Sequence, residues 1–244
     1  MATPTDPVLD VPTAALILPA FNEERGLAAT LRAVEAALNG NVQRVQIVVV
    51  DDGSTDGTAS VAEAAGVTLV RHPSNRGKGA AIRSGVAATD AANVVVMDAD
   101  ATYPPDAIEP MLRLIEGGHD YVSGTRRAGR QHIPLMNRLG NVAIATAIRL
   151  LGGSSLADPL TGMYALRRSA LSQLAPAANG FAVETEIAIR AAHAGLRTAQ
   201  LPIAYGRREG VSKLRPLRDG WPILRTILIL TLLRRRSRRA RSAS

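Results

Sequence analysis

The segment Val94-Val-Val-Met-Asp98-Ala-Asp100 places strand-forming apolar residues directly before two carboxylates. Residues two apart on a strand point to the same side. At the end of a strand in an open α/β sheet, Asp98 and Asp100 are therefore expected to face the ligand crevice. Paired carboxylates suit a hard divalent cation that also binds substrate phosphates. The competing interpretation is a strand end with two solvated acids, because Asp-x-Asp is frequent by chance.

Two earlier apolar runs also end in polar, turn-forming residues. Ala14–Leu18 leads into Pro19-Ala-Phe-Asn-Glu23, and Val45–Val50 leads into Asp51-Asp-Gly53. Further on, Asn75-Arg-Gly-Lys-Gly79 forms a basic, glycine-rich turn before another helical segment. Any one of these loops is ordinary turn chemistry, since Asp, Gly and Ser are common turn residues. Together, at one edge of a parallel sheet, they indicate a nucleotide-phosphate site.

The alternation of strands and helices predicts a mostly parallel, Rossmann-like sheet with helices on both faces. Asn22 is expected to cap the first helix. A strand is expected over Asp120–Ser123, followed by a basic loop over Gly124–Arg130. The expected helices lie near residues 23–38, 55–65, 77–87, 105–115 and 135–151, with another opened by residues 181–186.

Composition agrees with one catalytic domain. A chain of 244 residues with 46% hydrophobic content is long enough for a packed α/β core. Aromatic residues make up only 3%, which leaves little for stacking on nucleic acid bases. The absence of cysteine excludes disulfides and thiolate metal ligands. The first residues do not have the pattern of a signal peptide, and we expect residues 1–12 to be disordered.

The motifs together resemble family 2, inverting GT-A glycosyltransferases, and most of all the dolichyl- or polyprenyl-phosphate sugar synthases. The resemblance rests on Pro19-Ala-Phe-Asn-Glu, Val50-Asp-Asp-Gly-Ser-Thr-Asp-Gly-Thr, Asn75-Arg-Gly-Lys-Gly and Asp98-Ala-Asp, and it runs from about Ala14 to Leu214. It implies a GT-A domain over residues 13–214, followed by a C-terminal part with amphipathic helices. Transmembrane helices that some members carry after the catalytic domain have no counterpart in this pattern.

The resemblance also implies roles for particular residues. Mg²⁺ or Mn²⁺ is expected at Asp98 and Asp100, and Asp158 belongs to an Asp-x-x-Thr-Gly segment that the family shares. Arg126 and Arg138 are expected to bind the acceptor phosphate. Arg207 and Arg208 compete for a single family arginine at the donor diphosphate. The expected nucleotide-sugar ligands are Pro19, Ala20, Asn22, Glu23, Asp52, Lys78, Asp98, Ala99, Asp100, Arg208 and Lys213.

The expected reaction moves a hexose from a nucleotide sugar, such as GDP-mannose or UDP-glucose, to a polyprenyl phosphate. A hydroxyl acceptor needs a general base, for which Asp158 and Glu184 are candidates. A phosphomonoester, with a second pKa of about 6, is already largely ionised and needs none. Two arginines near the acceptor favour the phosphate, because arginine recognises phosphate well.

Three other functions are consistent with parts of the sequence. The same fold could glycosylate a soluble hydroxyl acceptor. A nucleotidyltransferase also uses paired carboxylates, but its glycine-rich loop directly after the first strand is replaced here by Pro19-Ala-Phe-Asn. A nucleic-acid-binding protein is suggested only by the basic C-terminus, and the carboxylate clusters argue against it.

The C-terminal part, residues 215–244, combines an apolar segment with a basic tail. Trp221–Leu233 is too short to span a bilayer, which takes about 20 residues. It is followed by Arg234, Arg235, Arg236, Arg238, Arg239 and Arg241, which account for most of the net charge of +8. A helix buried on the catalytic domain is one interpretation. The arginines favour an interfacial helix drawn to anionic lipid, with the protein cytoplasmic and peripheral on the inner face of the cell membrane.

Overall fold

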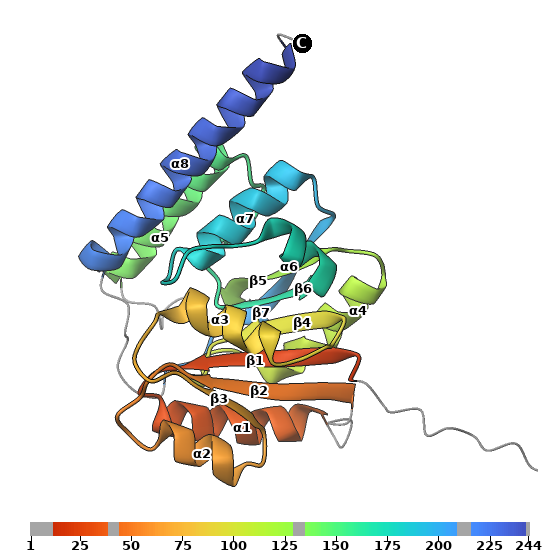
Figure 1. Cartoon of the computed structure of the whole chain (residues 1–244), viewed down its shortest axis with the longest axis vertical. Helices are drawn as coiled ribbons and strands as arrows, with labels where there is room; N and C mark the ends of the chain where they lie inside the picture. Colours follow the sequence, from red (N-terminus) through yellow and green to blue (C-terminus); the bar gives the residue numbers. More distant parts are fainter. Residues whose placement is uncertain (1–11, 39–43, 129–134, 209–215, 243–244) are drawn as a thin grey trace, which may run out of the picture.

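The computed structural model describes residues 12–38, 44–128, 135–208 and 216–242. A seven-stranded sheet of order β3-β2-β1-β4-β6-β5-β7 forms its centre (Figure 1). The strands are β1 Ala14–Ala20, β2 Val45–Asp51, β3 Thr68–Arg71, β4 Asn93–Met97, β5 Tyr121–Ala128, β6 Met163–Arg167 and β7 Thr198–Ala204. The helices are α1 Glu24–Leu38, α2 Thr58–Ala64, α3 Lys78–Ala87, η2 Pro105–Ala107, α4 Ile108–Glu116, α5 Leu135–Ala147, η4 Ile148–Gly152, α6 Arg168–Leu174, α7 Val183–Ala194 and α8 Pro216–Ser242.

The strand sequences explain why both faces of the sheet are covered. In β1, Leu16 and Leu18 belong to one core, and Ile17 belongs to the other. Helices α1, α2 and α4 contribute to the first core, whereas α3, α6 and α7 contribute to the second. Near-continuous apolar strands are what a parallel sheet buried on both faces requires. The predicted α/β class and the mostly parallel sheet are therefore confirmed.

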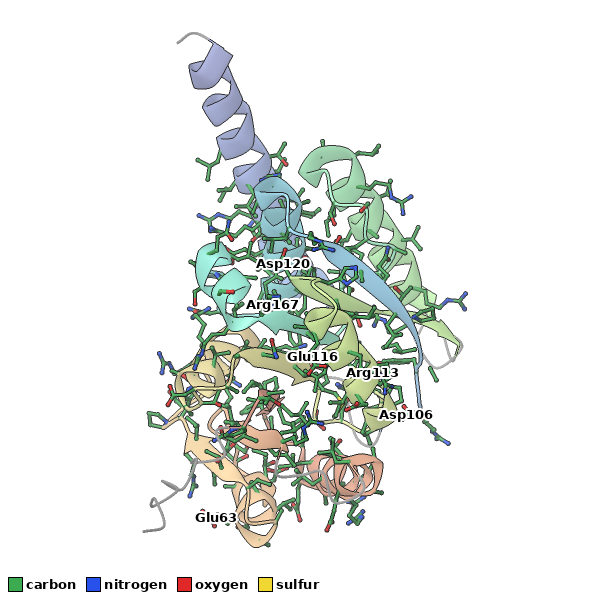
Figure 2. All side chains as sticks on the ribbon, turned by 90° about the vertical axis from the view of Figure 1, so that its right-hand side faces the viewer. Glu63, Asp106, Arg113, Glu116, Asp120 and Arg167 are labelled. Atoms are coloured by element: carbon green, nitrogen blue, oxygen red, sulfur yellow. The ribbon has the colours of Figure 1, made fainter. Side chains whose placement is uncertain are left out.

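Helix α4 is amphipathic, with apolar side chains facing the sheet and charged side chains facing solvent. Ile108, Met111 and Ile115 are buried under the sheet, and the charged residues Arg113 and Glu116 are exposed (Figure 2). Nearby, Nε of Arg167, the last residue of β6, lies 3.9 Å from Oδ1 of Asp120, which directly precedes β5. Such partly exposed ion pairs contribute little to stability, so α4 is held mainly by its apolar side chains, together with the hydrogen bond from Arg167 Nη2 to the Ile115 carbonyl at 2.6 Å.

In the second half of the chain, the strand directions and the length of β5 differ from what the sequence predicted. Strand β6 runs antiparallel to both β4 and β5, while β7 pairs in parallel with β5. The segment Gly124–Ala128, expected as a loop, continues β5, and the prediction was wrong there because the partner strand β7 lies about 75 residues away. Residues 129 and 130 of that expected loop lie outside the described residues, as does the expected disordered segment except for residue 12.

Two helix starts also differ from expectation. Helix α1 begins at Glu24, and the Glu23 carbonyl accepts its first hydrogen bond from Leu27 N at 2.7 Å. Asn22 therefore precedes the cap position that was predicted for it. Helix α2 begins at Thr58 instead of Thr55, because Asp56 Oδ1 accepts a hydrogen bond from Thr58 N at 3.0 Å and holds the preceding turn.

Helix α8 lies beside α5 and extends beyond the body of the protein at its C-terminal end (Figure 1). Ile223, Ile227 and Leu230 pack against Ile148 and Ile189. The hydroxyl of Thr231 donates a hydrogen bond to the Leu151 carbonyl at 3.2 Å. The apolar segment and the arginine run thus belong to one helix. None of the described helices is both long and apolar enough to cross a bilayer.

Candidate active site

The carboxyl ends of β1, β2 and β4 meet the start of α3 at one edge of the sheet. Strand β4 ends at Met97, so Asp98 and Asp100 lie in the loop beyond it and not on the strand. The strand alternation that was expected to align them therefore does not apply, and the loop with its contacts sets where each carboxylate lies. Both carboxylates contribute to the electrostatic environment of Arg208. The structure thus brings the two acids to one site.

Asp98 is paired with the lysine of the glycine-rich turn. Lys78 Nζ lies 2.6 Å from Asp98 Oδ1 and 2.5 Å from Glu184 Oε1. The contact with Glu184 is a buried ion pair. Burial alone lowers the pKa of Lys78, but the charges of Asp98 and Glu184 raise that pKa well above its ordinary value. Burial raises the pKa of Glu184 above its ordinary value; the nearby Lys78 ammonium opposes this increase, and the Asp98 charge adds to it.

Asp100 has a different cation. Its Oδ2 is paired with Arg208 Nη2, and its Oδ1 accepts hydrogen bonds from Thr102 N at 3.1 Å and Thr102 Oγ1 at 2.5 Å. Arg208 Nη1 also lies 4.0 Å from Glu23 Oε1. Burial lowers the pKa of Arg208, and the Asp100 charge raises it above its ordinary value overall. Arg207, the competing candidate, is exposed, and Lys213 lies outside the described residues.

Two glycines allow backbone to approach the acid loop. A Cβ on Gly162 would lie 2.1 Å from Asp98 Oδ2, and one on Gly26 would lie 2.9 Å from the Ala99 carbonyl oxygen. Gly162 N donates a hydrogen bond to the Tyr103 hydroxyl at 2.7 Å, and Gly162 O accepts one from Asp98 N at 3.1 Å. The Thr161-Gly162 segment therefore forms one wall of the Asp98 site.

The predicted nucleoside residues join the first two loops. Asn22 has a φ of 51°, and its Oδ1 accepts a hydrogen bond from Thr55 N at 2.8 Å. Glu23 N donates to Thr58 Oγ1 at 2.9 Å. Pro19 and Ala20 are the last residues of β1, where the Ala20 carbonyl accepts a hydrogen bond from Asp52 N at 2.8 Å. These contacts fix the loop shape on the side where a nucleoside was expected.

Asp52 holds the turn that leads to Lys78. Its Oδ1 accepts a hydrogen bond from Arg76 N at 2.9 Å, and its Oδ2 accepts one from Gly77 N at 2.7 Å. The same Oδ1 lies 2.6 Å from His72 Nδ1, and His72 Nε2 lies 2.9 Å from Ser84 Oγ. Asp52 is buried and much of its hydrogen-bonding capacity is used within the protein.

The glycine-rich turn before α3 does not present its amides as a phosphate cradle. Gly79 N and Ala80 N both donate to the Asn179 carbonyl, at 2.6 and 3.2 Å. A Cβ on Gly77 would lie 2.5 Å from that same oxygen. These glycines are explained by the close approach of the loop before α7. The prediction that Lys78 of this turn contacts the nucleotide sugar concerns its side chain and stays a prediction.

Arg126 and Asp158 form a buried bidentate pair. Arg126 Nε lies 2.6 Å from Asp158 Oδ2, and Nη2 lies 2.7 Å from Oδ1. The guanidinium also stands 5.4 Å from the ring centroid of Tyr205. Burial lowers the pKa of Arg126, but its partners, Tyr103 and Asp158 foremost, raise that pKa further above its ordinary value. Arg138 is exposed on α5, and the described contacts do not join it to Arg126.

Comparison with known proteins decides the family. The profile of Glycosyl transferase family 2 matches residues 15–175. The chain belongs to this family. It is therefore an enzyme that transfers a sugar, and the nucleotidyltransferase interpretation is set aside.

Relatives of this glycosyltransferase include enzymes named for lipid-phosphate acceptors. A dolichyl-phosphate hexose transferase of Haloferax volcanii is 34% identical over 219 residues, which cover 89% of this chain and 93% of that protein. A dolichol-phosphate mannosyltransferase of Mycosarcoma maydis is 27% identical over 221 residues, with 83% and 74% covered.

The fold also matches a solved enzyme with a different acceptor. Glucosyl-3-phosphoglycerate synthase from Mycobacterium tuberculosis, in complex with Mn²⁺, UDP and glucosyl-3-phosphoglycerate, matches with a TM-score of 0.68 and 27% identity, covering 91% of this chain and 80% of that one. Another structure of that enzyme contains Mg²⁺ and UDP, with a TM-score of 0.66 and 25% identity.

The acid loop of this glycosyltransferase fits a Mg²⁺ or Mn²⁺ ion that is completed by substrate. Among the described residues there is no group of three or more His, Asp or Glu side chains that could enclose a metal. Magnesium is often held by one or two carboxylates together with substrate phosphates and water. Asp98 and Asp100 are the carboxylates that would hold such an ion, and a bound nucleotide diphosphate would supply further oxygens.

Sequence reasoning missed Tyr103 and Tyr205. Their rings meet edge-on with centroids 5.3 Å apart, between Gly162 and Arg126. The only local signal was that both are among the four tyrosines of a chain poor in aromatic residues. Their contact joins the loop after β4 to the end of β7, which a linear pattern does not reveal.

Proposed function

We propose that this glycosyltransferase moves a hexose from a nucleotide sugar to a polyprenyl phosphate with inversion at the anomeric carbon. The similarity over most of both chains to a dolichyl-phosphate hexose transferase supports this acceptor class. GDP-mannose and UDP-glucose are the donors to test first.

The chemistry follows from the charges at the acid loop. An oxygen of the acceptor phosphate attacks the anomeric carbon from the face opposite the diphosphate, and the bond from that carbon to the diphosphate oxygen breaks. The nucleoside diphosphate leaves with the bonding electrons and gathers negative charge. Arg208, already at this site, offers preorganised positive charge for it. A divalent cation bound at the acid loop supplies further charge stabilisation.

The observation that carries the proposal concerns the two candidate general bases. Both oxygens of Asp158 accept hydrogen bonds from Arg126, and Glu184 is buried against Lys78. Neither carboxylate is placed to take a proton from an acceptor hydroxyl. A phosphomonoester acceptor needs no such base, because its second pKa is about 6. The geometry therefore supports a phosphate acceptor over a hydroxyl acceptor.

The other proposed contacts follow the layout of the site. The nucleoside lies by the loops after β1 and β2, near Asn22, Glu23 and Asp52. The acceptor phosphate lies on the Arg126 side, with the exposed Arg138 on α5 as its second ligand. Lys213 is proposed to assist Arg208 at the diphosphate.

The surface of α8 supports a lipid-bound acceptor. Its outward side carries Trp221, Leu224, Leu228 and Leu232, which are all exposed. Apart from the exposed Arg225 on the same side, these side chains are apolar and are not covered by the described part of the protein. The arginine run that follows adds attraction to anionic lipid. We place the enzyme in the cytoplasm, peripheral on the inner face of the cell membrane, with this apolar side in the lipid interface.

A product assay tests the proposed function. Purified full-length enzyme is incubated with GDP-mannose, UDP-glucose or UDP-N-acetylglucosamine, a C55 polyprenyl phosphate in anionic vesicles, and Mg²⁺ or Mn²⁺. Mass spectrometry should detect one glycosyl phosphate lipid, and its anomeric configuration should be inverted relative to the donor. If none of the donors yields a glycosyl phosphate lipid, the proposal of a polyprenyl phosphate acceptor is contradicted.

A second candidate acceptor is a small phosphorylated hydroxyl compound. The fold similarity to glucosyl-3-phosphoglycerate synthase favours it. The same assay with 3-phosphoglycerate in place of the lipid separates the two. Product from phosphoglycerate alone would replace the lipid proposal.

A further inference from the structure

His72 is buried at the point where three elements of the donor side meet. It directly follows β3, and its side chain is only 4% exposed, as is that of Asp52 after β2. His72 N donates a hydrogen bond to the Asp51 carbonyl at 2.9 Å. The third element is α3, whose Ser84 Oγ lies 2.9 Å from His72 Nε2. The histidine lies outside the motifs that suggested the function.

The partners of His72 decide which of its ring nitrogens carries a hydrogen. An ionised carboxylate only accepts hydrogen bonds, so Nδ1, which lies 2.6 Å from Asp52 Oδ1, donates. In a neutral imidazole the other nitrogen is then an acceptor, and it receives the hydroxyl of Ser84. The result is a buried chain in which Ser84 orients the ring and the ring holds Asp52.

Three donors of the protein fix the Asp52 carboxylate. Its Oδ1 accepts from His72 and from Arg76 N at 2.9 Å, and its Oδ2 accepts from Gly77 N at 2.7 Å. An ionised carboxylate has about four acceptor positions, so these contacts leave one on Oδ2. His72 supplies the donor that belongs to a side chain, and it is therefore the donor that a substitution can remove.

The start of α3 is held independently of Asp52. Gly79 N and Ala80 N donate to the Asn179 carbonyl at 2.6 and 3.2 Å. Lys78 is paired with two acids of its own. Loss of the imidazole should therefore disturb the loop after β2 and leave Lys78 in place. This separates an effect on nucleotide binding from an effect on the chemical step.

We propose that His72 is a positioning residue of the nucleoside subsite and acts through Asp52. It keeps Oδ1 occupied and turns the remaining position of Oδ2 toward the nucleoside of the donor, which supplies one N–H or O–H group. This inference rests on the proposed function, because it assumes a nucleotide-sugar donor on this side of the sheet. It requires that His72 affects donor affinity more than turnover.

Substitutions of His72 test this role through the donors that they keep. His72→Asn places an amide N–H near the position of Nδ1, whereas His72→Leu has no donor. In His72→Leu, the calorimetric Kd of UDP or GDP, whichever the wild type binds, and the donor KM should rise by about tenfold or more, because a hydrogen bond to a carboxylate is lost. kcat at saturating donor and KM for the acceptor should stay near the wild-type values. His72→Asn should recover most of the nucleotide affinity.

Two further variants guard against an effect of folding alone. His72→Gln carries its amide one bond farther out, where it reaches Ser84 instead of Asp52, and its nucleotide Kd should resemble that of His72→Leu. His119→Leu removes a partly buried histidine just after α4, whose Nδ1 lies 3.0 Å from the Leu114 carbonyl, and it should leave nucleotide affinity unchanged. Melting temperatures set the temperature at which all variants are compared in the folded state.

The outcomes are separable. A folded His72→Leu or His72→Gln protein with the wild-type nucleotide Kd overturns the proposal. The same loss of affinity in His72→Asn as in His72→Leu also overturns it, since the hydrogen bond to Asp52 would not be the cause. So does an equal rise in the acceptor KM, because the effect would then not be confined to the nucleoside. Wild-type enzyme that binds neither UDP nor GDP, with or without Mn²⁺, contradicts the proposed function instead.

Discussion

The guanidinium of Arg126 donates two hydrogen bonds to the carboxylate of Asp158, with Nε–Oδ2 and Nη2–Oδ1 distances of 2.6 and 2.7 Å. Both side chains are buried. Removing one member of a buried pair leaves an uncompensated charge, at a cost of roughly 3–5 kcal/mol. Arg126, which is proposed to bind the acceptor phosphate, therefore also stabilises the fold. Variants of Arg126 are expected to change stability as well as acceptor binding.

Arg138 offers the cleaner test of acceptor binding, because it is exposed. A charge-assisted contact is worth roughly 1.5–3 kcal/mol, so Arg138→Ala should raise the apparent KM for polyprenyl phosphate by about tenfold or more. Its melting temperature and its calorimetric affinity for the donor nucleotide should match the wild type.

Arg126→Lys should weaken acceptor kinetics and stability together, because a lysine keeps the charge and loses the bidentate geometry. If either variant loses nucleotide affinity while acceptor kinetics stay normal, the two arginines belong to the donor side.

Asp100→Asn should remove turnover, because it takes away a carboxylate that is proposed to hold the divalent cation. The amide oxygen can still accept the Thr102 hydrogen bonds, so the fold should be retained. Initial rates with Mn²⁺ and circular dichroism measure the two effects. Full activity of a folded Asp100→Asn enzyme in EDTA would remove the metal from the mechanism.

Gly162→Ala should reduce kcat by on the order of a hundredfold, because the new methyl displaces Asp98 and small misplacements at a reacting centre are costly. Gly180→Ala is the matched control, since a Cβ there meets no atom within 4 Å. Single-turnover rates at saturating donor report the effect. Equal rates for the two variants would show that the position of Asp98 does not limit the reaction.

The outward side of α8 should bind anionic vesicles in a salt-sensitive way. Replacing the exposed Leu224, Leu228 and Leu232 with Gln should reduce vesicle flotation and leave the melting temperature unchanged, because none of them belongs to the core. A chain ending at Leu233 should also float less, because each arginine near an anionic lipid surface contributes about 1 kcal/mol to the free energy of membrane binding. Equal flotation of all three proteins, or none of any, contradicts α8 as the membrane contact.

The α/β class, the positions of most helices in the first half and the family of the chain could all be predicted from the amino-acid sequence. These properties follow from local signals: apolar runs that end in Asp, Asn and Gly, and amphipathic periodicity between them. Asp98 and Asp100 were recognisable for the same reason, because they directly follow an apolar strand.

Which charged side chains form pairs could be learned only from the folded protein. Lys78 with Glu184, Arg126 with Asp158, and Arg208 with Asp100 are separated by 32 to 108 residues, and no local pattern encodes such pairs. The same holds for the antiparallel β6, whose direction depends on its partners β4 and β5. Burial then fixes these pairs, because an acid or a base removed from water must find its counter-charge wherever the fold brings one.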